Sequence, residues 1–152
     1  MKSAVATISS DQLTAGISPF GAELQHLTTS NGRELLWDGN PTYWTGKAPI
    51  LFPVIGVLQG GYYRLDGKFY LMPKHGFARH STFDIVESAT DAATFRLTAS
   101  GNTRSIYPFE FQLDIRFFVA GIFVSEALMI VAVIVRVAPA TKKRISSWNS
   151  NG

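Results

Sequence analysis

The chain has 152 residues, of which 46% are hydrophobic and 16% charged, so it is long and apolar enough for one domain with a buried core. It contains no cysteine, which excludes a disulfide scaffold, cysteine-bound zinc, iron–sulfur clusters and thiol catalysis. Its net charge of +3 arises after residue 116, because residues 1–116 carry ten basic and ten acidic side chains, and we therefore expect no nucleic-acid binding.

The first forty residues have the pattern of short strands joined by polar turns. Residues 4–8 and 13–17 flank a Ser-Ser-Asp-Gln turn and predict a β-hairpin. Residues 21–27 alternate apolar and polar side chains, which is typical of a half-buried strand. Asn31-Gly32 is a turn dipeptide because both residues tolerate positive φ, and a short apolar segment follows at 34–37.

Clearer strand pairs follow in the middle of the chain. Residues 62–65 and 68–71 flank Asp-Gly, which favours a two-residue hairpin turn. Residues 82–87 and 93–98 predict a second pair, and residues 109–117 again alternate apolar and polar side chains. No segment up to residue 116 has a convincing amphipathic helical pattern. Short strands at this spacing predict an all-β protein, either a sandwich or a barrel.

The character of the sequence changes at residue 117. Residues 117–135 are largely apolar and carry one charge, Glu126, and basic residues follow them. This length and this basic flank fit a transmembrane helix. The Val, Ile and Phe content fits buried strands equally well. A third interpretation is a tail that is not native to the fold, as at the end of a frameshifted reading frame. The start of the chain lacks an apolar signal segment, so we expect a cytoplasmic protein.

His75 is the histidine whose surroundings best fit a binding or catalytic role. It lies in Met72-Pro-Lys-His-Gly-Phe-Ala-Arg79, where the glycine allows a ligand to approach the backbone and three cationic or titratable groups fall within six residues. An ordinary basic loop between two strands is the simpler explanation of the same residues. His26 and His80 occupy strand and loop positions where solvated histidines are usual.

Other common catalytic motifs are missing from the sequence. Residues 48–56 form a proline-bracketed apolar run, and Gly60-Gly61 follows it. No Lys-Ser/Thr pair comes after these glycines, so we reject a phosphate-binding P-loop. The chain also has no nucleophile elbow and no pair of carboxylates at a recognisable spacing.

Several segments occur in an order and at a spacing that together are specific. They are Phe20–Leu24, Glu34–Gly39, Tyr43-Trp44, Ala48–Gly56, the Asp66-Gly67 hairpin, Lys74–Arg79 and Tyr107–Phe109. With them, residues 13–117 resemble the N-terminal half of the galactose mutarotase-like family, in the aldose 1-epimerase branch that includes hexose-6-phosphate mutarotases. The resemblance implies a large antiparallel β-sandwich with a sugar cleft on one face. This chain would form an incomplete version of that sandwich.

The resemblance also implies an activity, the interconversion of the α and β anomers of a hexose or hexose phosphate by ring opening. A base removes the proton of the anomeric hydroxyl while an acid protonates the ring oxygen, and no cofactor or metal is needed. His75 matches the family's first catalytic histidine, which hydrogen-bonds the sugar near its reacting end. Lys74 and Arg79 match substrate-binding positions. Trp44 and Phe77 could stack on a sugar face, although core positions explain both aromatic residues at least as well.

The sequence departs from the family at three points that matter for catalysis. Val57 stands where the family commonly has an arginine. The general-acid histidine and the catalytic glutamate lie in the C-terminal half of the family, whereas this chain has no histidine after His80 and no acidic residue after Glu126. We therefore expect residues 1–117 to be the N-terminal part of the sandwich and residues 118–152 to be an apolar, then basic, frameshifted or non-native tail. Anomerisation by this chain would be impaired.

A second hypothesis is a non-catalytic carbohydrate-binding module that is completed as a homodimer through exposed sheet edges. A third is a small β-domain anchored in a membrane by residues 117–135. Once the resemblance is considered, a non-native tail is favoured over buried strands, and a membrane helix is the least favoured of the three.

Overall fold

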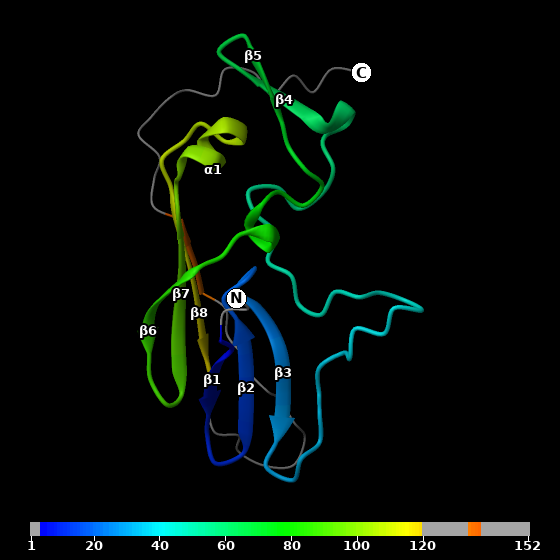
Figure 1. The fold of residues 1–152 in the computed structure, drawn as a ribbon, viewed down its shortest axis with the longest axis vertical. Helices are drawn as coiled ribbons and strands as arrows, with labels where there is room; N and C mark the ends of the chain where they lie inside the picture. The colour runs from blue at the N-terminus through cyan, green and yellow to red at the C-terminus, as the bar shows by residue number, and fades with distance from the viewer. Residues whose placement is uncertain (1–3, 120–133, 138–152) are drawn as a thin grey trace.

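The computed structural model describes residues 4–119 and 134–137 (Figure 1). Most of the regular structure is antiparallel β-strand. The elements are β1 (Ala6–Ser9), β2 (Leu13–Ser18), β3 (Glu23–Thr29), the 3₁₀ turn η1 (Gln59–Gly61), β4 (Tyr62–Leu65), β5 (Lys68–Leu71), the 3₁₀ turn η2 (Ala78–His80), β6 (Asp84–Ser88), β7 (Ala92–Thr98), α1 (Gly101–Ile106), β8 (Gln112–Phe118) and β9 (Ile134–Val137).

Two antiparallel sheets form the body of the molecule, one in the order β1–β2–β3 and the other in the order β6–β7–β8–β9. In the first sheet, Ala15 of β2 lies opposite Ile8 and Leu27. In the second, Phe95 of β7 lies opposite Ile85 and Ile115. The strand pairs predicted for the start of the chain and for residues 82–98 are therefore confirmed.

The two sheets share one hydrophobic core. Alternate residues of the inner strands face it and are fully buried: Ala15 and Ile17 of β2, Phe95 of β7, and Leu113 and Ile115 of β8. Burial of one such large side chain contributes about 1.5–3 kcal/mol, so the two-residue alternation decides which face of each strand turns inward. This arrangement confirms the predicted antiparallel β-sandwich, which is incomplete in the part of the chain that the structure describes.

The β4–β5 hairpin projects beyond the sheets, at the top of Figure 1. Asp66 and Gly67 form its turn with φ values of 48° and 79°, as the Asp-Gly dipeptide predicted. The rings of Tyr63 and Tyr70 stack across the two strands with centroids 5.4 Å apart. The Tyr63 hydroxyl donates a hydrogen bond of 2.9 Å to the carbonyl of Ile106, which connects the hairpin to α1. Burial raises the pKa of Tyr63 to about 12, with smaller contributions from Tyr107 and Tyr70.

The short helix α1 was not expected, because the sequence up to residue 116 shows no helical periodicity. Six residues are too few for an apolar stripe, and the helix depends on its cap instead. The Ser100 hydroxyl accepts the N–H of Thr103 at 3.2 Å, and the Thr103 hydroxyl accepts the N–H of Ser100 at 2.8 Å. This reciprocal capping box replaces the usual Glu or Gln with Thr.

The tail is described only in part. β8 extends to Phe118, and β9 pairs with it so that Ile134 lies opposite Arg116. The three interpretations of the tail depend mainly on residues 120–133 and 138–152. These residues lie outside the part of the chain that the structure describes. No helix within residues 4–119 or 134–137 has the length and apolar content needed to cross a bilayer.

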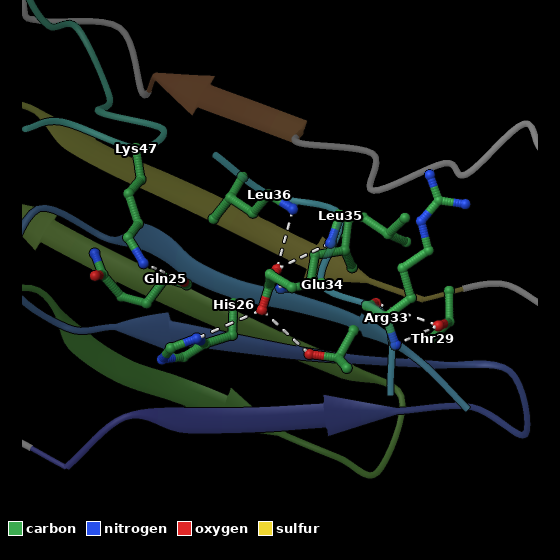
Figure 2. Close-up of polar contacts among 10 residues, drawn as sticks. Gln25, His26, Thr29, Arg33, Glu34, Leu35, Leu36 and Lys47 are labelled. Carbon is green, nitrogen blue, oxygen red and sulfur yellow. Dashed lines mark hydrogen bonds and ion pairs between the residues drawn. The ribbon is translucent and has the colours of Figure 1, made fainter. Parts of the chain in front are cut away.

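The open edge of β3 is covered by the loop that follows it (Figure 2). The carboxylate of Glu34 accepts the backbone N–H groups of Leu27 at 2.8 Å, Leu36 at 3.0 Å and Leu35 at 3.2 Å. Leu35 in turn donates its N–H to the carbonyl of Leu27 at 2.8 Å. The predicted apolar segment at 34–37 is thus an edge cover with one isolated bridge, between Thr28 and Glu34, and not a full strand.

A second carboxylate holds the far end of the same loop. Glu23 on β3 accepts the backbone N–H groups of Lys47 and Ala48, both at 3.1 Å. The Lys47 ammonium donates to the carbonyl of Gln25 at 2.9 Å. Covering the edge in this way satisfies backbone groups that would otherwise be available to another chain.

The segment containing His75 lies against the proline-bracketed run. The carbonyl of Phe52 accepts the N–H of Phe77 at 2.9 Å and that of Ala78 at 3.3 Å. Gly76 lies beside Phe52 with a φ of 73°, and a Cβ at position 76 would overlap the Phe52 carbonyl. Glycine is therefore required at 76 for two separate reasons, the left-handed backbone and the close approach.

Replacing Glu34 by Gln tests whether the carboxylate stabilises the β3 edge. Burial raises the pKa of Glu34, but the backbone N–H groups of Leu27, Leu36 and Leu35 lower it more, and the net pKa lies below 4.5. The stabilisation is therefore complete above the unfolded pKa and is lost as the pH falls through the lower folded pKa. We expect Glu34→Gln to reduce the free energy of unfolding by about 1 kcal/mol at neutral pH, a low value because water reaches the carboxylate.

Urea denaturation at pH 7 and below pH 4 measures this difference, which should shrink in acid. His26→Ala is the control, because His26 forms only an exposed 3.7 Å ion pair with Glu34. We expect that variant to change the stability by less than about 0.5 kcal/mol. An equal loss in both variants would assign the effect to the ion pair and contradict the backbone explanation.

Replacing Gly76 by Ala tests the contact with Phe52. The left-handed backbone and the overlap with the carbonyl should together reduce the free energy of unfolding by about 3 kcal/mol. Gly67→Ala is a matched control, because Gly67 also has positive φ but has nothing within 4 Å of an added Cβ. It should cost only about 1 kcal/mol in urea denaturation. Equal losses of unfolding free energy in the two variants would show that the close approach between Gly76 and Phe52 does not affect stability.

Candidate functional site

The backbone around His75 is held from one side by residues 52–56. Besides the bonds to Phe52, the N–H of His75 donates to the carbonyl of Gly56 at 2.9 Å. His75 itself has a φ of 69°, an unusual conformation for a residue with a side chain. Backbone strain of this kind persists only where surrounding contacts impose it, and it is concentrated at functional sites.

The imidazole of His75 is oriented by a main-chain carbonyl. Its Nδ1 lies 2.8 Å from the carbonyl oxygen of Ile55. Because a carbonyl can only accept, Nδ1 carries the proton, and in the neutral ring Nε2 keeps its lone pair. The side chain is partly exposed, and Nε2 has no hydrogen-bond partner among the described residues. His75 can therefore accept a hydrogen bond or a proton from a bound ligand.

Two cationic side chains flank His75 in sequence. Lys74 is exposed and Arg79 is half-buried. Within residues 4–119 and 134–137, neither side chain has an ion-pair or hydrogen-bond partner. The backbone carbonyl of Arg79 would lie 3.0 Å from a Cβ at Gly21, so this glycine allows the segment to pass close to the turn before β3. The segment thus presents two positive charges, without partners among the described residues, beside the His75 imidazole.

The two aromatic candidates lie in different surroundings. Phe77 is only 6% exposed, and its ring packs against Phe52, Phe111 and Tyr107 with centroids 5.7–6.1 Å apart. Trp44 is 48% exposed, in the long loop that covers β3, where its carbonyl accepts the indole N–H of Trp37 at 2.8 Å. Phe77 is thus a core aromatic residue with restricted access, and stacking of a sugar on either ring stays a prediction.

Sequence reasoning identified the segment but not what holds it. The carbonyl of Ile55 orients the His75 ring, and the carbonyl of Gly56 binds its backbone N–H. Every residue has a main-chain carbonyl, so the pattern of side chains does not predict which carbonyls take this role. The apolar Ile55 and Val57 side chains beside them are 82% and 69% exposed, so this face of the molecule is open. Among the described residues, no group of three or more His, Asp or Glu side chains is placed to hold a metal ion.

Comparison with known proteins identifies relatives of this chain. The aldose 1-epimerase family model matches residues 4–121. The chromosomal protein LacX of Lactococcus lactis subsp. lactis is 31% identical over 119 residues, which cover 75% of this chain and 40% of the relative. The plasmid LacX protein of the same organism is 29% identical over the same shares. The chain therefore spans about two fifths of the length of the curated relatives that it matches.

Solved structures resemble the same part of the chain. A galactose mutarotase-like protein from Lactobacillus casei ATCC 334 is 38% identical with a TM-score of 0.73, and the match covers 76% of this chain and 40% of that one. A galactose mutarotase related enzyme from Lactobacillus acidophilus is 34% identical with the same TM-score of 0.73, over 75% and 38% of the two chains. From its sandwich, its matched segments and these likenesses, the chain belongs to the aldose 1-epimerase family.

Proposed function

We propose that this chain forms the His75 side of a sugar-binding surface and that its chemistry is the anomerisation of a hexose. The observation that carries the proposal is the fixed imidazole of His75. Its Nδ1 is engaged by the Ile55 carbonyl at 2.8 Å, which leaves Nε2 for a ligand. A strained, oriented histidine on an open face is better explained by ligand recognition than by packing.

Anomerisation needs two proton transfers. A base removes the proton from the anomeric hydroxyl, the bond between the anomeric carbon and the ring oxygen breaks, and an acid protonates the ring oxygen. Ring closure on the other face of the resulting carbonyl reverses both transfers, so no atom or electron is gained or lost. The Nε2 of His75 is suited to one hydrogen bond at this reacting end of the sugar.

A second proton-transfer group is needed, and no Asp, Glu or His side chain of the described residues is hydrogen-bonded to His75. One general acid or base contributes about 10²- to 10⁴-fold to such a reaction. We therefore expect the 152-residue chain to bind a sugar more effectively than it converts one. A non-catalytic carbohydrate-binding role is the second candidate function, and this shortage of proton-transfer groups favours it.

The charge beside His75 favours an anionic sugar. Lys74 and Arg79 have no anionic partner among the described residues, so a phosphate on the substrate could be placed near them. The pair is solvent-accessible, so salt should weaken the attraction. A hexose phosphate is therefore the substrate class that we propose. Homodimerisation through an open sheet edge is a further proposal, supported by the exposure of all five residues of β6.

Replacing His75 by Ala tests the binding role. In an NMR titration of the full chain with D-glucose, we expect amide shifts in residues 74–77. His75→Ala should weaken this binding about fivefold, the equivalent of one lost hydrogen bond. His26→Ala is the control, since His26 is an exposed histidine on another element. Unchanged binding in His75→Ala would contradict the proposed site.

The same preparations test catalysis by polarimetry of freshly dissolved α-D-glucose. We expect little acceleration over the uncatalysed reaction. Rapid anomerisation that disappears in His75→Ala would show that this chain already contains both proton-transfer groups. That result would retain the site and overturn the expectation of impaired turnover.

The preference for a phosphate is tested by comparing glucose with glucose 6-phosphate. Lys74→Gln should reduce the advantage of the phosphorylated sugar about two- to fivefold at low salt, and added salt should reduce it further. Lys68→Gln removes an exposed lysine from β5 and should leave the ratio unchanged. Equal affinities for the two sugars in the unmodified chain would exclude the anionic preference.

A further inference from the structure

A second hollow lies away from the Nε2 face of His75. It has a volume of about 500 Å³ and is bounded by η2, β6, β7 and α1. His75, Lys74 and Arg79 do not line it, and Phe77 is the one residue that it shares with the candidate site. Its size falls within the range of small-ligand sites in proteins.

The lining of the hollow combines apolar and hydrogen-bonding surface. Phe77 and Leu97 supply only a small apolar area, since they are 6% and 8% exposed. Five Ser or Thr residues also line the hollow, and the hydroxyls of Ser81, Ser100 and Thr103 are already hydrogen-bonded within the chain. Asp84 and Asn102 also line it, and both are exposed. Neither side chain has a hydrogen-bond partner within residues 4–119 and 134–137. Their acceptor and donor groups are therefore available to a ligand that offers several hydroxyls.

Charge decides which class of ligand fits. Arg96 lines the hollow, but its guanidinium is bound in a two-pronged ion pair to Asp114, with both N–O distances 2.7 Å. Its charge is thereby compensated, whereas Asp84 adds a negative charge without a partner among the described residues. The exposed His80 is the other ionisable residue of the lining. An anion would be repelled by the Asp84 carboxylate. A neutral polyol can instead donate two adjacent hydroxyls to the carboxylate oxygens and exchange hydrogen bonds with an amide.

The N-terminal N–H groups of the neighbouring helix α1 do not account for ligand recognition in the hollow. The first N–H groups of α1 face the Ser100 cap, whose hydroxyl already accepts the N–H of Thr103. Recognition would therefore depend on the side chains of Asp84 and Asn102, which β6 and α1 bring to one place. These residues are 18 positions apart in the chain.

We propose that this hollow is a second binding site, separate from His75, for a neutral polyhydroxylated ligand of monosaccharide size. The hydroxyls of the ligand would face Asp84 and Asn102, and its C–H groups would contact the small exposed areas of Phe77 and Leu97. For about twelve non-hydrogen atoms, typical ligand efficiencies correspond to a dissociation constant on the order of 1 mM.

The test uses myo-inositol, a polyol that has no anomeric carbon and so cannot be a substrate for anomerisation. In an ¹⁵N NMR titration of the full 152-residue chain, we expect saturable amide shifts at Asp84 and Asn102. Asp84→Asn should weaken the binding about fivefold, because a charge-assisted acceptor is lost. Asp11→Asn makes the same change at an exposed turn and should bind like the unmodified chain.

Four outcomes separate this site from the first. Unchanged inositol binding in His75→Ala supports two independent sites, whereas its loss there would assign the binding to the His75 segment and overturn the proposal. Saturable shifts with inorganic phosphate at Asp84 would overturn the choice of a neutral ligand. Equal inositol binding by Asp84→Asn and the unmodified chain would also overturn the proposal, while leaving the proposed function of His75 untouched.

Discussion

The contact between the Phe52 carbonyl and Gly76 positions the candidate chemistry of this protein. One oxygen accepts two successive backbone N–H groups and lies where any side chain at position 76 would be. This contact aligns residues 52–56 with the following loop. The carbonyls of Ile55 and Gly56 can then hold the ring and the backbone of His75. The orientation of the imidazole is thus a consequence of main-chain geometry, and it needs no second ionisable side chain.

Hydrogen bonds to main-chain groups also organise the edge of the first sheet. Glu23 and Glu34 use their carboxylates to bind main-chain N–H groups, and in doing so they fasten the long loop at both ends. Carboxylates are well suited to this because each can accept several hydrogen bonds and the negative charge strengthens them. The loop covers the edge of β3, whereas β6 at the edge of the other sheet stays exposed. Association through a sheet edge is therefore expected at β6 and not at β3.

The His75 segment and the polar hollow differ in how they are built. The candidate residues from Lys74 to Arg79 are neighbours in the chain, so their proximity follows from covalent connection. The hollow collects Asp84, Arg96 and Asn102 from two strands and a helix, and it exists only because those elements pack together. The two surfaces also differ in charge, since uncompensated cations flank the first and a carboxylate without a described partner faces the second. Ligands of different charge would therefore be expected at the two surfaces.

Local rules in the sequence predicted most of the strands, although residues 34–37 form only an isolated bridge. Two-residue alternation predicted the buried face of β8, and the Asp66-Gly67 turn predicted the β4–β5 hairpin, because both depend on interactions within a few residues. The order of motifs from residue 13 to residue 117 was sufficient to indicate the aldose 1-epimerase family. The sequence also singled out the segment around His75, through a glycine that was expected to let a ligand approach the backbone. In the structure the Phe52 carbonyl makes that close approach instead.

Tertiary structure alone decided the rest. The helix α1 was missed because six residues held by a Ser–Thr cap carry no periodic signal. The orientation of His75 and the hollow beside Asp84 were also hidden, because main-chain carbonyls and contacts between distant elements leave no residue pattern in a sequence. The sequence by itself thus determined the features that depend on neighbouring residues, which are the strands, the turns and the motifs. What depends on non-local packing, the direction of an imidazole and the shape of a cavity, appeared only when the chain was folded.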